Sequence, residues 1–317
     1  MSLLLEVEGL EVAFARTSAV RGASLTVARG ETHCLVGESG CGKSVTALSV
    51  MNLLARGARR SAKRLSFEGQ DLLALPESGM ARLRGNAMAM IFQEPMTSLN
   101  PAYTVGSQMT EVMRRHKKAS QRVATDRAAD LLARVGITAP GLRLGQFPHQ
   151  LSGGLRQRVM IAMALMCEPR LLIADEPTTA LDVTVQAQIL RLLAGLQRDL
   201  GLGMLLITHD LGIVARVAHR VSVMYAGEVV ESAPTAELFA NPRHPYTQGL
   251  LRCVPVPGRI RRDEPLGSIP GTVPRIGPGF AGCAFRDRCS FADAACSGTI
   301  PRHAAGAGHE FLCRLAA

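Results

Sequence analysis

Residues 37–44 have the composition of a loop that binds phosphate. Gly37, Glu38, Ser39, Gly40, Cys41, Gly42, Lys43 and Ser44 match the pattern G-x-x-x-x-G-K-[ST] in full. Glycines let backbone N–H groups close around phosphate, and the N-terminus of the following helix adds partial positive charge. The pattern places the ammonium of Lys43 at the β and γ phosphates and the hydroxyl of Ser44 on Mg²⁺. The sequence therefore predicts a site for a nucleoside triphosphate.

Two carboxylates follow a second apolar run. Residues 171–174 read as a buried strand, and Asp175 and Glu176 come directly after it. In open α/β sheets, ligands bind at the carboxyl ends of the strands. Asp175 would hold Mg²⁺ through its water shell, and Glu176 would polarise the attacking water. A strand that ends in two acidic residues is common, so this pair indicates a nucleotide site only in combination with the phosphate loop.

A third candidate is the segment of Leu151, Ser152, Gly153 and Gly154, which precedes a predicted helix. Ser152 is a good N-cap residue, and the two glycines expose amides that could face an anion. Taken alone, the segment is equally well explained as an ordinary capped helix.

The elements that must position these residues alternate between strands and helices. Strand 32–36, the loop and helix 45–54 form one unit, and glycine or proline ends several of the later helices. Ala226 and Gly227 mark the turn of a hairpin over residues 221–232. The remaining expected elements are strands 4–12, 171–174 and 204–208 and helices 104–115, 121–135, 155–167 and 189–200.

Composition is that of a globular protein without a membrane anchor. Of the 317 residues, 47% are hydrophobic and 20% charged, and neither a bilayer-length apolar run nor an N-terminal leader pattern is present. The net charge of +10 would suit nucleic acid, anionic lipid or a polyphosphate. Aromatic residues that could stack on bases are missing from the basic stretches, so we expect no nucleic-acid partner.

These features occur in the order and spacing of a known family. The phosphate loop, Gln93, residues 151–154, residues 171–176, the Ala180-Leu181-Asp182 segment and His209 together resemble ABC ATPases over residues 4–250. The resemblance implies a P-loop α/β core with a small antiparallel β region at its start. It also implies a helical subdomain around residues 94–160.

The resemblance assigns further roles. Two subunits would sandwich ATP, with the phosphate loop of one facing residues 151–154 of the other. Gln93 would sense Mg²⁺, water and the membrane subunit, His209 would contact the γ-phosphate, and Asp182 would communicate across the dimer. Phe14 stands where the family places an aromatic ring against adenine. Leu155 departs from the glutamine of many members, which leaves only the backbone amides of the two glycines for that contact.

A narrower resemblance points to the ATPase subunit labelled D of dipeptide and oligopeptide permeases. It rests on residues 91–101, on Pro148-His149-Gln150, and on residues 241–247, where His244-Pro245-Tyr246 reads as a turn that packs the tail on the core. This implies a peptide importer with two membrane permease subunits, a related second ATPase subunit and an external solute-binding protein. Nickel or glutathione import by the same motor is an alternative, as is a soluble ABC ATPase not coupled to transport.

The tail, residues 251–317, is rich in proline and glycine. Beyond Cys253 it contains Cys283, Cys289, Cys296 and Cys313, which we call the four tail cysteines. Crowded cysteines in a cytosolic chain favour metal ligation over disulfides, and this spacing lacks the close pairs of zinc ribbons. The tails of the resembling branch bind a [4Fe–4S] cluster. Zinc and free thiols remain alternatives.

We therefore expect an ATPase with a nucleotide-binding domain over residues 1–250 and a cluster-bearing extension over residues 251–317. It would work at the cytoplasmic face of the inner membrane. Because the phosphate loop and the tail are assigned to different domains, cluster loss is expected to harm assembly more than hydrolysis.

Overall fold

The computed structural model describes residues 3–15, 17–94, 98–179, 181–254, 267–277, 279–306 and 308–315. Pro95, Met96 and Thr97 of the importer-like stretch and Ala180 of the Ala-Leu-Asp segment lie outside the described residues. The chain forms two compact units, and each is built from separate stretches of sequence. The first comprises residues 1–4, 27–30 and 74–207, and the second comprises residues 5–26, 31–73 and 208–317.

The first unit contains parallel strands. β8 (Leu171–Asp175) pairs in parallel with β7 (Met88–Ile91) on one side and with β9 (Gly203–Thr208) on the other. Every residue of β8 and β9 is buried, as expected for strands covered on both faces. The predicted strands 171–174 and 204–208 are confirmed.

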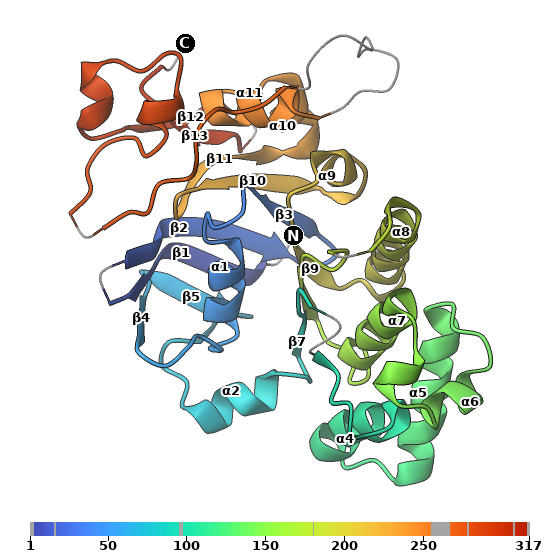
Figure 1. Ribbon diagram of the computed structural model, residues 1–317. Helices are drawn as coiled ribbons and strands as arrows, with labels where there is room; N and C mark the ends of the chain where they lie inside the picture. Colours follow the sequence, from blue (N-terminus) through green and yellow to red (C-terminus); the bar gives the residue numbers. More distant parts are fainter. Residues whose placement is uncertain are drawn as a thin grey trace. The chain divides into compact units, whose positions relative to one another are not determined.

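The helical insertion is confirmed in the same unit. Figure 1 shows its helices α4, α5, α6 and α7 grouped together. Thr104, Ser120, Ser152 and Asp182 each cap a helix through a side-chain oxygen, which satisfies an otherwise unpaired amide. The helices are α2 (Glu77–Leu83), α4 (Val105–Lys117), α5 (Gln121–Arg134), α6 (Pro140–Leu144), α7 (Gly153–Ala164) and α8 (Val183–Leu200), with a 3₁₀ turn, η1 (Pro148–Gln150).

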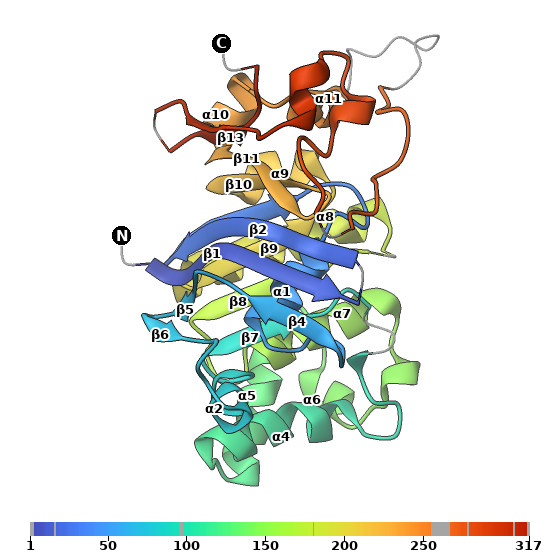
Figure 2. The ribbon, with the colours of Figure 1, turned by 90° about the vertical axis from the view of Figure 1, so that its left-hand side faces the viewer.

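The second unit begins with the expected antiparallel region. Its strand order is β2-β1-β5-β6, and β4 also pairs with β1 (Figure 2). The strands are β1 (Leu3–Phe14), β2 (Thr17–Ala28), β4 (Ala58–Ser61), β5 (Arg64–Phe67) and β6 (Gln70–Asp71).

A second group of strands in this unit has the order β12-β13-β11-β10-β3. β3 (Thr32–Val36) pairs in parallel with β10 (Arg220–Tyr225), and β10 forms a hairpin with β11 (Glu228–Pro234). Ala226 and Gly227 turn this hairpin with φ of +43° and +88°, which confirms the predicted turn. The tail adds β13 (Glu310–Leu312) and β12 (Arg302–Ala304) to the edge of β11.

The helices of the second unit are α1 (Lys43–Val50), α9 (Leu211–Val217), α10 (Thr235–Ala240) and α11 (Pro245–Arg252), with 3₁₀ turns η2 (Arg286–Arg288) and η3 (Ala294–Ser297). The tail is otherwise irregular, as predicted, but its two strands were not foreseen because three-residue strands carry no readable alternation. In the described part of the chain, we find no helix with the length and apolarity needed to span a bilayer. The domain boundary at residue 250 stays a prediction, yet the tail and the phosphate loop both belong to the second unit.

Candidate functional site

The phosphate loop connects β3 to α1, as the sequence predicted. Gly37, Gly40 and Gly42 have φ of +152°, +79° and +109°, which other residues rarely adopt. A Cβ at Gly37 would lie 2.2 Å from the carbonyl oxygen of Met224, and one at Gly42 would lie 2.5 Å from that of Ala19. Two of the three glycines are therefore required by packing as well as by backbone conformation.

Lys43 is the first residue of α1 and is almost fully buried, with 4% of its surface exposed. Its Nζ donates to the carbonyl oxygens of Gly37 at 2.8 Å and Glu38 at 3.1 Å. These bonds hold the ammonium of Lys43 against the phosphate loop. Ser44 follows at the second helical position and is partly exposed.

The tip of the loop is open, because Ser39 and Gly40 are both exposed. Cys41 is buried, and its carbonyl oxygen accepts a hydrogen bond from the N–H of Gly227 at 2.8 Å. Burial raises the pKa of the Cys41 thiol, so the side chain is a neutral packing group at pH 7. The contribution of Cys41 to a phosphate site therefore comes from its backbone.

The carboxylates of the first unit lie at the end of β8. Gln93 Nε2 donates to Glu176 Oε2 at 3.2 Å, and Thr179 Oγ1 donates to the same oxygen at 3.1 Å. The N–H of Glu176 donates to the carbonyl oxygen of Ile207 at 3.0 Å, on the neighbouring strand. The structure thus brings Gln93 and Glu176 together, 83 residues apart in sequence.

Glu176 has a left-handed backbone, with φ of +44°. Such conformations are uncommon for residues other than glycine and cluster at functional sites. Asp175 and Glu176 are also 4% and 8% exposed, and burying carboxylates is costly unless a partner or cation neutralises them. Both observations favour a functional site here.

The Leu151–Gly154 segment has the predicted capped geometry. Ser152 Oγ accepts from the N–H of Leu155 at 3.4 Å, and Gly153 and Gly154 are the first residues of α7. A Cβ on Gly154 would lie 3.2 Å from Cγ1 of Val185 on α8. The second glycine therefore also has a packing role, and the anion-binding role of both amides stays a prediction.

The other candidates occupy expected positions without a demonstrated task. Phe14 ends β1 and is half-buried, and His209 lies exposed between β9 and α9. Asp182 Oδ1 accepts from the N–H of Val185 at 2.9 Å and so caps α8. Their proposed contacts with adenine, γ-phosphate and a second subunit stay predictions.

The four tail cysteines share one small cavity with Phe285, Phe291 and Ile300. None of the eight cysteines, all of which the structure describes, forms a disulfide. Burial, together with the charges of Cys313, Cys296 and Cys289 when they ionise, raises the pKa of Cys283 to about 11. Within the described residues, however, no group of three or more histidine, cysteine, aspartate or glutamate side chains is arranged to hold a metal ion. The predicted cysteine cluster is brought together, but the structure does not confirm metal binding.

Two contacts at the phosphate loop were not foreseen. The N–H of Glu38 donates to the Oη of Tyr246 at 2.9 Å, and its carboxylate pairs with Arg288, which is 250 residues away. The His-Pro-Tyr segment begins α11, with His244 as its N-cap, so it is not the turn that the sequence predicted. It does pack the tail on the core, since the Tyr246 ring lies 5.3 Å from that of Phe285. Arg288 had no sequence signal, because an isolated arginine in an irregular tail does not reveal its partner.

The candidate residues are divided between the units. The phosphate loop, Phe14, His209 and the tail cysteines belong to the second, and Gln93, Ser152, Gly153, Gly154, Asp175 and Glu176 belong to the first.

Comparison with known proteins gives consistent results. Residues 20–179 match the ABC transporter family, and residues 230–296 match the C-terminal region of oligopeptide/dipeptide transporters. A putative peptide import ATP-binding protein of Brucella abortus is 53% identical over 312 residues, covering 94% of this chain and 92% of the relative. The dipeptide transport ATP-binding protein of Escherichia coli is 49% identical over 302 residues, with 94% and 92% covered.

Solved structures show the same fold. CbiO1 of Clostridium perfringens, part of the ABC transporter complex CbiONQ, has a TM-score of 0.66 at 29% identity and covers 76% of this chain and 92% of its own. A dimeric ATP-binding cassette with ADP and phosphate bound has a TM-score of 0.66 at 23% identity, covering 73% and 99%, and supports the fold alone. The sequence motifs, the phosphate loop and these relatives agree, so the chain belongs to the ABC transporter family and is an ATP-hydrolysing subunit.

Proposed function

We propose that this ATPase powers the import of dipeptides or oligopeptides through partner permease subunits. The observation that carries the proposal is the match of residues 230–296 to the C-terminal region of oligopeptide/dipeptide transporters. This range includes most of β11, all of α10 and α11, and Cys283, Cys289 and Cys296. Relatives named for peptide and dipeptide transport cover nearly the whole chain, which favours the same cargo here.

Uptake measurements test the cargo. A strain lacking this chain should lose uptake of a labelled dipeptide and of a labelled tetrapeptide, and the wild-type gene should restore it. Nickel and glutathione uptake are measured in the same strains. Loss of nickel or glutathione uptake with intact peptide uptake would assign the other cargo, and no change in any of them would favour an ATPase not coupled to transport.

For the ATP site we propose the roles that the motifs imply. Lys43 neutralises the β and γ phosphates, and Ser44 and Asp175 hold Mg²⁺ with help from Gln93. Glu176 polarises the attacking water, and His209 contacts the γ-phosphate. The amides after Ser152 face ATP bound to a second subunit, and Phe14 stacks on adenine.

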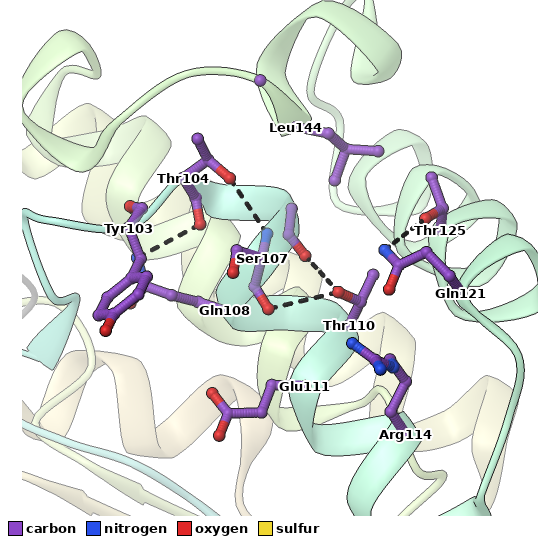
Figure 3. Close-up of a pocket in the computed structure, with 12 residues that line it drawn as sticks. Tyr103, Thr104, Ser107, Gln108, Thr110, Glu111, Arg114, Gln121, Thr125 and Leu144 are labelled. Carbon is purple, nitrogen blue, oxygen red and sulfur yellow. Dashed lines mark hydrogen bonds between the residues drawn. The ribbon is translucent and has the colours of Figure 1, made fainter.

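The permease partner is proposed to dock on the helical insertion. A cavity of about 890 Å³ is lined there by residues of α4, α5 and α6 and of the loop before α4. Figure 3 shows Tyr103, Glu111 and Arg114 among its side chains. Tyr103 is 56% exposed, and Leu142 on α6 is 76% exposed. Large exposed apolar groups beside charged ones are typical of protein interfaces.

The remaining partners are a second, related ATPase subunit and an external solute-binding protein that acts through the permease. This arrangement places the chain at the cytoplasmic face of the inner membrane.

We also propose that Cys283, Cys289, Cys296 and Cys313 hold one [4Fe–4S] cluster. The support is that all four thiols line the same cavity and that burial raises the pKa values of Cys283, Cys289 and Cys313. Neighbouring thiolates repel one another, and a positively charged iron cluster would relieve this repulsion. When bound, the cluster would staple the irregular tail.

His244 provides a second line of support. Its Nδ1 accepts from the N–H of Tyr246 at 3.1 Å, so the neutral ring carries its proton on Nε2. Burial lowers the pKa of His244 to about 4, which keeps the ring neutral at pH 7. Within the described chain, the buried Nε2 has no hydrogen-bond partner, and His244 lines the cysteine cavity. An N–H that needs an acceptor suits a site for thiolate or sulfide.

A further inference from the structure

Arg288 lies at the end of η2, between Cys283 and Cys289, and its guanidinium reaches the phosphate loop. Nη1 donates to Glu38 Oε2 at 2.7 Å, and Nη2 donates to Glu38 Oε1 at 2.9 Å. This is a bidentate arginine–carboxylate pair, the strongest and most directional form of ion pair. The side chains of Arg288 and Glu38 are 5% and 30% exposed, so the pair is shielded from solvent far more than a surface pair.

The rest of the guanidinium is also fixed within the second unit. Nε donates to the carbonyl oxygen of Pro270 at 2.7 Å, and Nη2 donates to that of Ile269 at 3.0 Å. Its carbon lies 5.7 Å from the ring centre of Tyr225 and 5.9 Å from that of Phe285. The hydrogen bonds to Glu38 raise the pKa of Arg288, so the charge is permanent. Because these contacts fix the guanidinium, a shift of the tail would move Arg288 and, with it, the Glu38 carboxylate that it binds.

Glu38 is an unusual neighbour for an anion. It is the second residue of a loop that binds phosphate, where an unpaired carboxylate would repel the triphosphate. Arg288 neutralises this carboxylate, while the Oη of Tyr246 accepts from the N–H of the same residue. Residues outside the loop therefore neutralise the carboxylate of Glu38 and bond its backbone N–H.

The tail is itself attached to the core at other points. The buried carboxylate of Glu231 on β11 accepts from the N–H groups of Arg243 and His244 and lies 2.7 Å from Nε2 of His309. At the other end, the N–H of Ser18 on β2 donates to the carbonyl oxygen of Ile276 at 3.0 Å. These contacts attach the described part of the tail to the core on both sides of Arg288.

We propose that Arg288 is a positioning residue for the phosphate loop, through which the fold of the cysteine-rich tail sets the affinity of this ATPase for nucleotide. The proposal depends neither on the transported cargo nor on what the cysteines bind. It goes beyond the sequence expectation that cluster loss harms assembly more than hydrolysis, because it adds a direct route from the tail to the phosphate loop.

The test compares Mg²⁺-ATP binding and steady-state hydrolysis for the wild type, Arg288→Ala, Arg288→Lys, Glu38→Gln and the double variant Glu38→Gln/Arg288→Ala. A fluorescent ATP analogue, displaced by Mg²⁺-ATP, reports affinity. Arg288→Ala should weaken binding and raise KM roughly tenfold while kcat changes less than twofold, because an unpaired carboxylate is left beside the phosphates. Arg288→Lys keeps the charge but not the two parallel bonds, so its loss should be smaller.

Adding Glu38→Gln to Arg288→Ala should recover most of the lost affinity, because it removes the repelling charge. Arg302→Ala is the matched control, since Arg302 is a tail arginine whose pair with Glu310 is exposed and 3.9 Å long. Protease resistance of the tail checks folding in every variant. If Arg288→Ala fails to fold, the comparison of Arg288→Lys with Arg302→Lys decides: Arg288→Lys must bind ATP more weakly than the wild type, and Arg302→Lys must not.

Three results would overturn the proposal. The first is wild-type affinity in a folded Arg288→Ala protein, or in Arg288→Lys where Arg288→Ala does not fold. The second is an equal loss in Arg302→Ala. The third is a double variant that binds as weakly as Arg288→Ala or more weakly. Because ATP binding is measured without permease or peptide, failure of the import proposal would leave this result intact.

Discussion

Replacing Glu176 with glutamine should separate ATP binding from ATP hydrolysis. The two donors that contact Glu176 Oε2, Gln93 Nε2 at 3.2 Å and Thr179 Oγ1 at 3.1 Å, can both bond the carbonyl oxygen of a glutamine side chain. The backbone bond to Ile207 is unaffected. The substitution therefore keeps the geometry and removes only the negative charge that would polarise water.

A positioned general base contributes roughly 10²–10⁴-fold to rate, which corresponds to about 3–5 kcal/mol of transition-state stabilisation. We expect kcat of the assembled transporter to fall by that factor, while ATP affinity stays within about threefold of the wild type. The closed, ATP-bound dimer should then accumulate. Thr179→Ala is the matched comparison, because it removes one charge-assisted hydrogen bond and should cost only about tenfold.

The measurements are phosphate release for turnover and displacement of a fluorescent nucleotide for affinity. A Glu176→Gln transporter that hydrolyses ATP within threefold of the wild-type rate would refute the assignment. A variant that loses both nucleotide binding and turnover would show that Glu176 is needed for binding. That result would also refute the assignment of Glu176 as the group that polarises water.

Three further predictions concern other residues. Lys43→Ala should weaken ATP binding by about 10–100-fold, measured by nucleotide displacement, because charge-assisted bonds to phosphate are lost; equal affinity in both proteins contradicts the phosphate-loop assignment. Buried His33 has its pKa lowered to about 4, mainly by desolvation, so the unfolded chain binds the extra proton first as pH falls. The free energy of unfolding, measured with urea, should stay constant above pH 6.5 and fall by about 3 kcal/mol toward pH 4. His33→Gln should reduce this dependence on pH, and equal slopes in the variant and the wild type would disprove the prediction. Cys289→Ser should abolish the brown colour and the roughly four irons of anaerobically purified protein, whereas Cys253→Ser should not; stoichiometric zinc in place of iron rules out the cluster.

The ligand of the ATP site could be predicted because the residues that indicate it are consecutive in the sequence. Residues 37–44 carry their own glycines, lysine and helix start, so the pattern determines both the loop and its ligand. The same holds for Ser152, whose hydroxyl caps the helix that begins one residue later. The buried strand before Asp175 was equally legible, because a short, continuous apolar run is typical of a strand that helices cover on both faces.

Other features depended on contacts between distant residues. Nothing in the sequence near Glu176 indicates its φ of +44°, which arises where Gln93, Thr179 and the neighbouring strand β9 meet it. The strands of the tail were invisible for a similar reason, since β13 exists only because β11 offers an edge.

The sequence by itself determined the family and the nucleotide, because both are indicated by short patterns whose spacing is set by the bound nucleotide. Only the tertiary structure decided where the tail acts. The pair between Arg288 and Glu38 joins residues 250 positions apart, and it is stabilised by two charge-assisted hydrogen bonds and by the rings of Tyr225 and Phe285 beside the guanidinium. A single arginine in an irregular segment has no spacing to read, so its partner becomes known only when the chain is folded.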